Sequence, residues 1–173
     1  MRRRTRKKVF GAVAGAAGGV AAAFAMNQFQ TIWAKAEKKL SHSPGGKSGG
    51  RGGDDATVRT AAGISKCIFR HELTDKEKKW AGPVVHYAFG GLMGAFYGAM
   101  ASRTSVATAG AGAGYGSAVW LLADEIGVPA AGLSGSPIRT PLIKHAEAWA
   151  SHLVYGLVMN GTRRAILKAL HVR

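Results

Sequence analysis

The feature that most constrains the fold is the separation of charged residues from apolar ones along the chain. Of the 24 Lys and Arg residues, six lie in the first eight positions, eleven between Lys35 and Lys79, and four after Thr162. The stretches between these clusters are long and nearly free of charge. This pattern favours an integral membrane protein over a soluble α/β enzyme. A disulfide-stapled domain is excluded because Cys67 is the single cysteine.

The apolar stretches are long enough to cross a bilayer as helices. A helix needs about 20 residues to span the hydrocarbon core. Four stretches meet this requirement, at residues 9–33, about 82–101, about 104–126 and about 145–167. Helices are expected because lipid offers no partner for an unpaired backbone amide. The predicted fold class is therefore an all-α polytopic membrane bundle of four transmembrane helices.

The first apolar segment has a second interpretation. Its basic start, its apolar stretch and the sequence Ala23-Phe24-Ala25 are also typical of a cleavable signal peptide. The apolar stretch is long for a signal peptide, however, and the polar and aromatic residues from Asn27 to Trp33 are typical of an interfacial anchor. We expect the helix to be retained.

The segments outside the predicted spans are hydrophilic. They are a basic arm at 1–8, a linker at 34–73 and a basic tail at 168–173, while 74–167 forms the three-helix membrane core. The linker contains a Gly-rich run at 41–53 and then a short amphipathic helix, whose apolar face carries Val58, Ala61, Ile64 and Ile68. This helix either lies on the membrane surface or packs on the bundle. Thr74 and Glu77 form a capping box that starts the second membrane helix.

Glycine recurs at every fourth residue in the first two predicted spans. In lipid, close packing through small residues holds helices together. The two series, which we interpret as a glycine zipper, are Gly11, Gly15 and Gly19 in the first span and Gly90, Gly94 and Gly98 in the second.

The net charge of +15 raises the question of a nucleic-acid partner. The basic residues flank apolar runs instead of forming a groove with interleaved aromatic residues, so we expect no nucleic-acid binding. The expected partners are anionic lipid headgroups of the bilayer and, as a further option, a second copy or another membrane protein. Four spans place both termini on one side. The dense N-terminal cluster and Arg163-Arg164 favour the cytoplasmic side of a bacterial inner membrane.

Ionisable residues inside membrane segments suggest function. At a rise of about 1.5 Å per residue, several of them reach one side of the bundle at similar depth. This predicted polar layer consists of His86, Asp124, Glu125, Glu147, His152 and Tyr155. Three interpretations stay open: hydrogen bonding between helices, a proton or ion pathway, and a haem or metal site with His86 and His152 as axial ligands.

The sequence contains no motif for a nucleophile elbow, a phosphate-binding loop or a CxxC pair. We therefore predict no catalytic residue and no cofactor, and a structural or interaction role. The alternative is a small transporter or proton-conducting protein that uses the polar layer.

Several stretches resemble the YagU-like family of small bacterial inner-membrane proteins. They are Leu73 to Lys78, Val85 to Gly98, Trp120 to Pro129 with Gly132-Leu133, and His152 to Gly156. The resemblance covers roughly residues 74–164. It implies a multi-helix inner-membrane protein without an established activity, in which His86, Asp124, Glu125 and His152 occupy the polar positions of the matching motifs. The Gly-rich linker stands where some relatives carry a Pro-Pro-Arg element.

Overall fold

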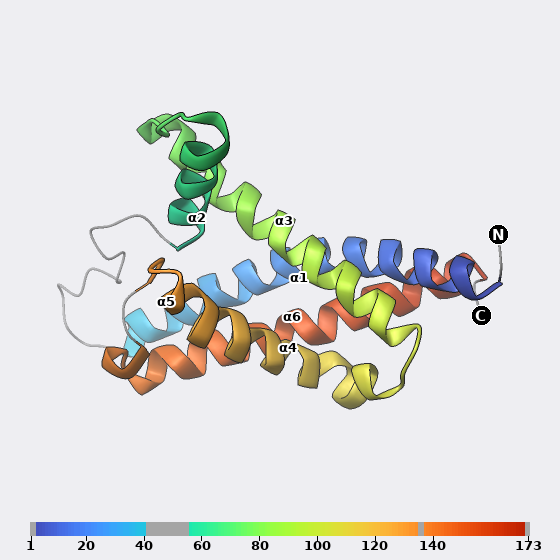
Figure 1. Ribbon diagram of the computed structural model, residues 1–173. Helices are drawn as coiled ribbons and strands as arrows, with labels where there is room; N and C mark the ends of the chain where they lie inside the picture. Colours follow the sequence, from blue (N-terminus) through green and yellow to red (C-terminus); the bar gives the residue numbers. More distant parts are fainter. Residues whose placement is uncertain (1–2, 41–55, 135–136, 172–173) are drawn as a thin grey trace.

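A computed structural model describes residues 3–40, 56–134 and 137–171, and within these ranges the chain is helical without any strand. This confirms the all-α class. Four long helical rods alternate in direction (Figure 1). The first is α1, Arg3–Leu40; the second is α3, Asp75–Ala101; the fourth is α6, Leu142–Ala169. The Gly-rich run at 41–53 lies outside the described residues.

The third rod is a series of short helical segments. It comprises the 3₁₀-helix η2 (Val106–Gly112), α4 (Ala113–Val119), the π-helix η3 (Trp120–Gly127) and α5 (Val128–Ala130). The structure therefore differs from the continuous helix expected at 104–126. The backbone leaves the helical region at Ala109 and has positive φ at Gly110, Ala111 and Gly112. Two of these three residues are glycines, which adopt positive φ without a steric penalty, and Ala111 between them is strained.

Helix α2, Ala56–Ile64, packs on the first part of α3, and a π-helical turn, η1 (Ser65–Phe69), follows it. Val58 and Thr57 lie over Gly82, which leaves no room for a larger residue there. Of the two placements left open for this amphipathic helix, the structure has the packed one. Figure 1 shows α2 beside the end of α3 that projects from the bundle.

Helix α3 begins where the capping box predicts. The side chain of Thr74 accepts a hydrogen bond from the backbone N–H of Glu77, and the Glu77 carboxylate accepts one from the backbone N–H of Thr74 at 2.7 Å. These hydrogen bonds from the backbone and hydroxyl of Thr74, together with one from His71, lower the pKa of Glu77 to about 2. The predicted helix start is confirmed.

Helices α1 and α3 pack antiparallel through their glycines. Gly11 lies opposite Gly98, Gly15 opposite Gly94, and Gly19 opposite Gly90. A Cβ atom added at Gly15 would collide with the backbone oxygen of Gly94, and one added at Gly94 would collide with the oxygen of Gly15. The two backbones are in contact, so no larger residue fits without moving a helix apart.

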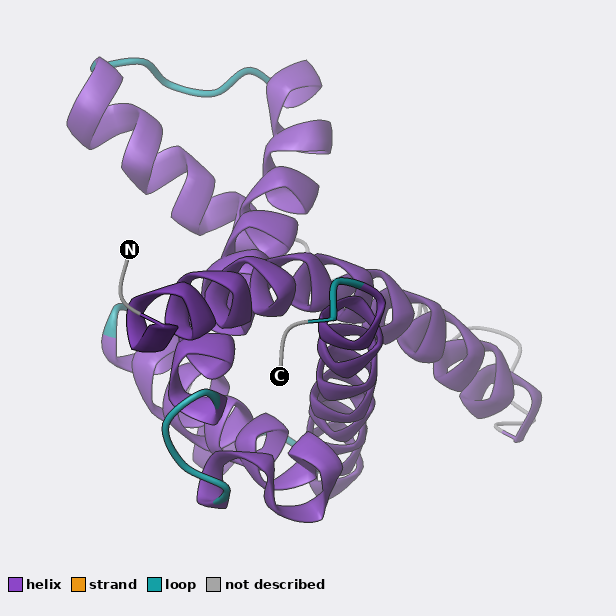
Figure 2. Ribbon diagram, turned by 90° about the vertical axis from the view of Figure 1, so that its right-hand side faces the viewer, coloured by secondary structure: helices purple, strands orange, loops and turns teal. Residues whose placement is uncertain are grey.

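The interfaces of α6 with the third rod and with α1 are also packed through glycines, but fewer glycines take part. Gly112 and Gly116 of the third rod lie against the backbone of His152 and Gly156 in α6, and Gly18 of α1 lies against the backbone of Met159. Seen along the rods, the helices form a ring in which α1 contacts α3 and α6 while the third rod contacts α6 (Figure 2).

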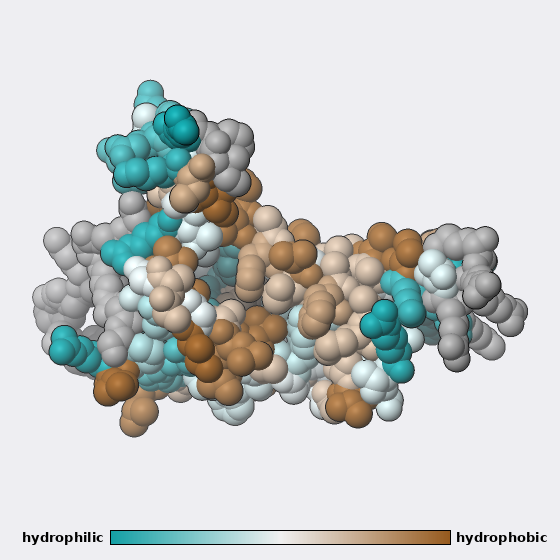
Figure 3. Space-filling view, in the orientation of Figure 1, coloured by the Kyte–Doolittle hydropathy of each residue, from teal (hydrophilic) through white to brown (hydrophobic). Residues whose placement is uncertain are grey.

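Burial is inverted relative to a water-soluble bundle. The buried hydrophobic residues are mostly alanines, with Met26, Met159, Tyr97, Tyr155 and Val119, and no described Leu, Ile or Phe side chain is buried. Large apolar residues point outward instead, among them Leu92 at 62% and Phe96 at 59% exposure. Figure 3 shows these hydrophobic residues gathered along the outside of the rods. The close approach of the backbones leaves no interior space for them.

By length and composition, one described helix, Thr5–Leu40, is apolar enough to cross a membrane. It lies near the N-terminus, where a signal sequence would meet the same criterion, and so would the core helix of a soluble protein.

The glycine contacts predict a large difference between two conservative substitutions. Gly94→Ala places a methyl group against the Gly15 carbonyl and should lower the free energy of unfolding by about 2 kcal/mol or more. Gly161→Ala, on the open side of α6 with nothing within 4 Å, should leave the free energy unchanged or raise it by up to about 1 kcal/mol. Denaturant titration of both variants in detergent micelles measures the difference. Equal effects would contradict backbone contact at Gly94.

Candidate functional site

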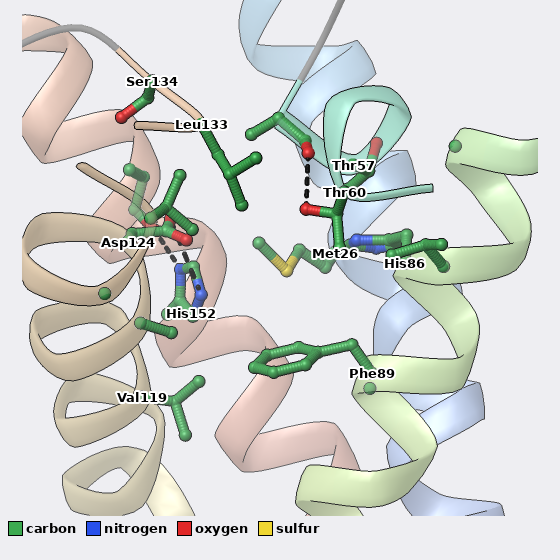
Figure 4. A pocket seen from close by; sticks show the side chains of 18 of the residues that line it. Met26, Thr57, Thr60, His86, Phe89, Val119, Asp124, Leu133, Ser134 and His152 are labelled. Carbon is green, nitrogen blue, oxygen red and sulfur yellow. Dashed lines mark hydrogen bonds and ion pairs between the residues drawn. The ribbon is translucent and has the colours of Figure 1, made fainter. Parts of the chain in front are cut away.

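A cavity of about 880 Å³ lies inside the end of the bundle that is remote from the chain termini. Its walls come from α1, α3, η3 and α6, and residues of α2 together with Leu133, Ser134, Pro137 and Thr140 surround its mouth. Figure 4 shows Asp124 and His152 on one wall and His86 and Phe89 on the opposite wall, with Met26 between them. The side chains that meet in this cavity come from segments far apart in the sequence.

The pair formed by His152 and Asp124 occupies one wall. His152 is 6% exposed, and its Nε2 lies 3.8 Å from Oδ2 of Asp124. Its Nδ1 lies 2.9 Å from the backbone oxygen of Ala148. A carbonyl oxygen only accepts, so Nδ1 donates this hydrogen bond and Nε2 is the ring nitrogen that faces the carboxylate.

His86 lies on the opposite wall, on α3. Its ring makes an edge contact with Tyr87, with 5.7 Å between centroids, and its Nε2 is buried without a hydrogen-bond partner among the described residues. An unsatisfied buried polar group costs about 1–3 kcal/mol. In Figure 4 the ring points toward Met26 and Thr60. The structure thus brings Asp124 and His152 together and places His86 across the cavity from them.

Two other members of the predicted layer lie at the rim. Oε1 of Glu125 is hydrogen-bonded to Nδ1 of His145 at 2.7 Å, and Oε2 of Glu147 accepts a hydrogen bond from Nζ of Lys144 at 2.8 Å. The same Nζ lies 2.9 Å from Glu37, so this pair of contacts ties α1 to α6. The hydrogen bonds from Glu147 and then Glu37 raise the pKa of Lys144. Glu125 and Glu147 are therefore paired with His145 and Lys144, two residues that line the cavity.

Tyr155 forms part of the inner end of the cavity. It is 4% exposed, and its hydroxyl donates a hydrogen bond of 2.6 Å to the backbone oxygen of Gly90. This bond joins α6 to α3 just where the glycine contacts between α1 and α3 end. The Tyr155 hydroxyl therefore has a partner already and serves the packing of helices.

Beyond Tyr155 the bundle is filled by a second group of polar side chains. The Tyr97 hydroxyl donates to Oδ1 of Asn160 at 2.8 Å, and the ring of Tyr97 packs on that of Tyr115 with 4.9 Å between centroids. Arg163 is 7% exposed, lies over the Tyr97 ring, and donates to the Ser102 hydroxyl at 3.5 Å. We call Tyr97, Tyr115, Asn160 and Arg163 the plug.

Sequence reasoning missed the plug and the ion pairs at the rim. Asn160 and Arg163 are polar residues in an apolar segment, which is the signal that could have identified them. The contact between Lys144 and Glu37 joins residues 107 positions apart, and spacing alone does not indicate such a pair.

The chemistry available in the cavity is proton exchange and hydrogen bonding. Three imidazoles, of His86, His145 and His152, and two carboxylates, of Asp124 and Glu125, line a mostly apolar space, and threonine hydroxyls from α2 lie near its mouth. Within the described ranges, no group of three or more His, Cys, Asp or Glu residues is placed to hold a metal ion. The haem interpretation stays a prediction.

Comparison with protein-family models gives one assignment. Residues 55–161 match the model described as "Protein of unknown function (DUF1440)". This match covers more than half of the chain and includes α2, α3, the third rod and most of α6. Neither the curated proteins nor the solved structures give a match. The chain belongs to the DUF1440 family of proteins of unknown function.

Proposed function

We propose that this chain is a four-span protein of the bacterial inner membrane, that it acts by binding in its cavity, and that it performs no enzymatic reaction. The proposal rests on the inverted burial, in which large apolar side chains point outward. Side chains such as Leu92, Phe96 and Leu157 are exposed, while the interior holds glycine, alanine and polar groups. Water would make such a surface unfavourable, and lipid solvates it. The resemblance to the YagU-like family supports the same location.

The modest overall hydropathy of α3 and α6 is compatible with crossing a membrane. Polar residues in the middle of these helices, namely Tyr97, Ser151, His152 and Asn160, are buried inside the bundle and do not face the surroundings. Glycine, which lowers mean hydropathy as well, lies at the helix contacts. The surface that would meet lipid is therefore more apolar than the average of each helix.

The distribution of charge supports cytoplasmic termini. The segments 3–8, 102–105 and 162–171 lie at one end of the bundle and contain nine Lys and Arg residues. They contain no Asp or Glu, because all acidic residues lie elsewhere in the sequence. Basic clusters beside membrane helices favour the cytoplasmic side and interact with anionic headgroups. The cavity then faces the periplasmic side.

Cysteine labelling tests both the membrane location and the topology. The native Cys67 is exposed, at the end remote from the termini. In spheroplasts it should react with a membrane-impermeant maleimide. A Cys67→Ser, Thr104→Cys variant places the thiol in the turn after α3, and it should react only after permeabilisation.

Carbonate extraction of the same cells gives the control. The protein should remain in the membrane pellet. Recovery of the chain in the supernatant would overturn the proposed function, and equal labelling of both cysteines in intact spheroplasts would overturn the topology.

The second candidate function is transport coupled to protons, or proton conduction. One observation favours it: Nε2 of His152 faces Asp124 inside the cavity, with His86 across from them. Imidazole and carboxylate groups relay protons in many membrane proteins. The plug closes the path beyond Tyr155, so conduction would require Tyr97 and Arg163 to move.

Proton flux into liposomes tests this candidate. The parent protein should acidify the lumen when a proton gradient is applied, and His152→Ala should reduce the flux at least about tenfold, since it removes the imidazole that faces Asp124. Phe96→Ala, on the outer face of α3, is the matched control and should keep the parent rate. A parent protein without flux above that of empty liposomes would rule out conduction.

A further inference from the structure

The cavity lies where two helices diverge. Helix α3 packs on α1 along its glycine face but makes little contact with α4 or η3. Figure 1 shows α3 moving away from the third rod toward the end that carries α2. The cavity lies in this divergence, with Phe89 and Met93 of α3 on one side and Val119 and Ala123 on the other. If the rods cross a bilayer, as proposed above, a molecule in the acyl-chain region could reach the cavity between these diverging helices.

The lining of the cavity is divided into two zones. Its inner part is apolar and is formed by Phe89 and Val119. Its outer part, toward α2, carries the His152–Asp124 pair and the hydroxyls of Thr57 and Thr60, which Figure 4 shows above the apolar zone. An apolar inner zone and a polar outer zone match a molecule that has a chain and a headgroup.

Lysine side chains at the rim offer a contact for an anionic headgroup. The carboxylates near the rim already have partners within the protein: Glu125 contacts His145, Glu147 and Glu37 both contact Lys144, and Asp124 lies 3.8 Å from His152. Lys78 and Lys79 also line the rim, and Lys79 is exposed. A ligand that brings one negative charge would therefore meet lysines, and His86 offers a ring nitrogen without a partner.

From this juxtaposition of two diverging helices, an apolar inner zone and a lysine-bearing rim, we propose that the cavity binds an anionic amphiphile with a single long alkyl chain. The chain lies between Phe89 and Val119, and the headgroup lies between Lys79 and His86. The volume of about 880 Å³ falls within the range of about 300–1,000 Å³ that is usual for ligand pockets. The headgroup is a carboxylate, as in a fatty acid, or a phosphate, as in a single-chain phospholipid product. This inference rests on the proposed membrane location.

Binding of three probes with the same chain tests the proposal. Palmitate, hexadecyl phosphate and hexadecanol are titrated into the purified full-length protein in maltoside micelles, and binding is followed by native mass spectrometry. At least one of the two anions should bind saturably and at least about tenfold more tightly than hexadecanol. The tighter anion identifies the headgroup. Equal binding of all three probes, or no saturable binding, would overturn the proposal.

Matched variants locate the site. Ala123→Phe fills the cavity and should weaken binding of the anion at least about tenfold, whereas Ala118→Phe, on the exposed side of the same rod, should leave binding unchanged. Lys79→Gln should weaken binding of the anions about threefold and leave binding of hexadecanol unchanged. Binding that survives Ala123→Phe would overturn the location.

A measurement on the unsubstituted protein covers the case in which Ala123→Phe does not fold. A palmitate analogue with a diazirine on its chain should label the peptides around Phe89 and Val119 when irradiated. Labelling confined to outward residues such as Leu92 would overturn the proposal. Carbonate extraction shows which proposal has failed. A protein that stays in the membrane but binds no ligand contradicts this inference alone. A protein that is extracted into the supernatant contradicts the proposed function as well.

Discussion

The structure depends on the contact between two backbones, that of α1 at Gly15 and Gly19 and that of α3 at Gly90 and Gly94. Because the backbones touch, the space between the rods accepts only small residues, and the large apolar side chains point outward. The same contact determines where the cavity begins. The paired glycines end at Gly19 and Gly90, and beyond them Met26 and His86 line the space between the helices.

The two halves of the bundle therefore differ in what fills them. On the side of the termini, Tyr97, Asn160 and Arg163 fill the interior with hydrogen-bonded side chains. On the other side, the His152–Asp124 pair lies at the wall of an open space. Tyr155 separates the halves through its bond to Gly90. A one-sided cavity of this kind suits binding from one leaflet or one solution better than passage through the bundle.

Features that depend on local spacing could be predicted from the sequence. The four-residue spacing identifies the glycine faces that the structure places together, and Thr74 with Glu77 marks the start of α3. Depth along the helices identifies His152 and Asp124 as neighbours. The break at Ala109 could not be predicted, because glycines occur at close packing and at chain reversals alike. The pairing of Glu147 with Lys144, three residues before it in the same helix, follows from local spacing, whereas the contact of Lys144 with Glu37 depends on how α1 and α6 pack, which sequence does not specify.

The central claim is that the outward apolar faces meet lipid, and nitroxide accessibility in liposomes tests it most directly. In a Cys67→Ser background, spin labels at Leu92→Cys and Leu157→Cys lie on the outer faces near the middle of α3 and α6. Collisions with dissolved oxygen should be frequent and collisions with a water-soluble nickel chelate rare, as expected in hydrocarbon. Frequent collisions with the nickel chelate at both positions would show that these faces meet water and would contradict the account.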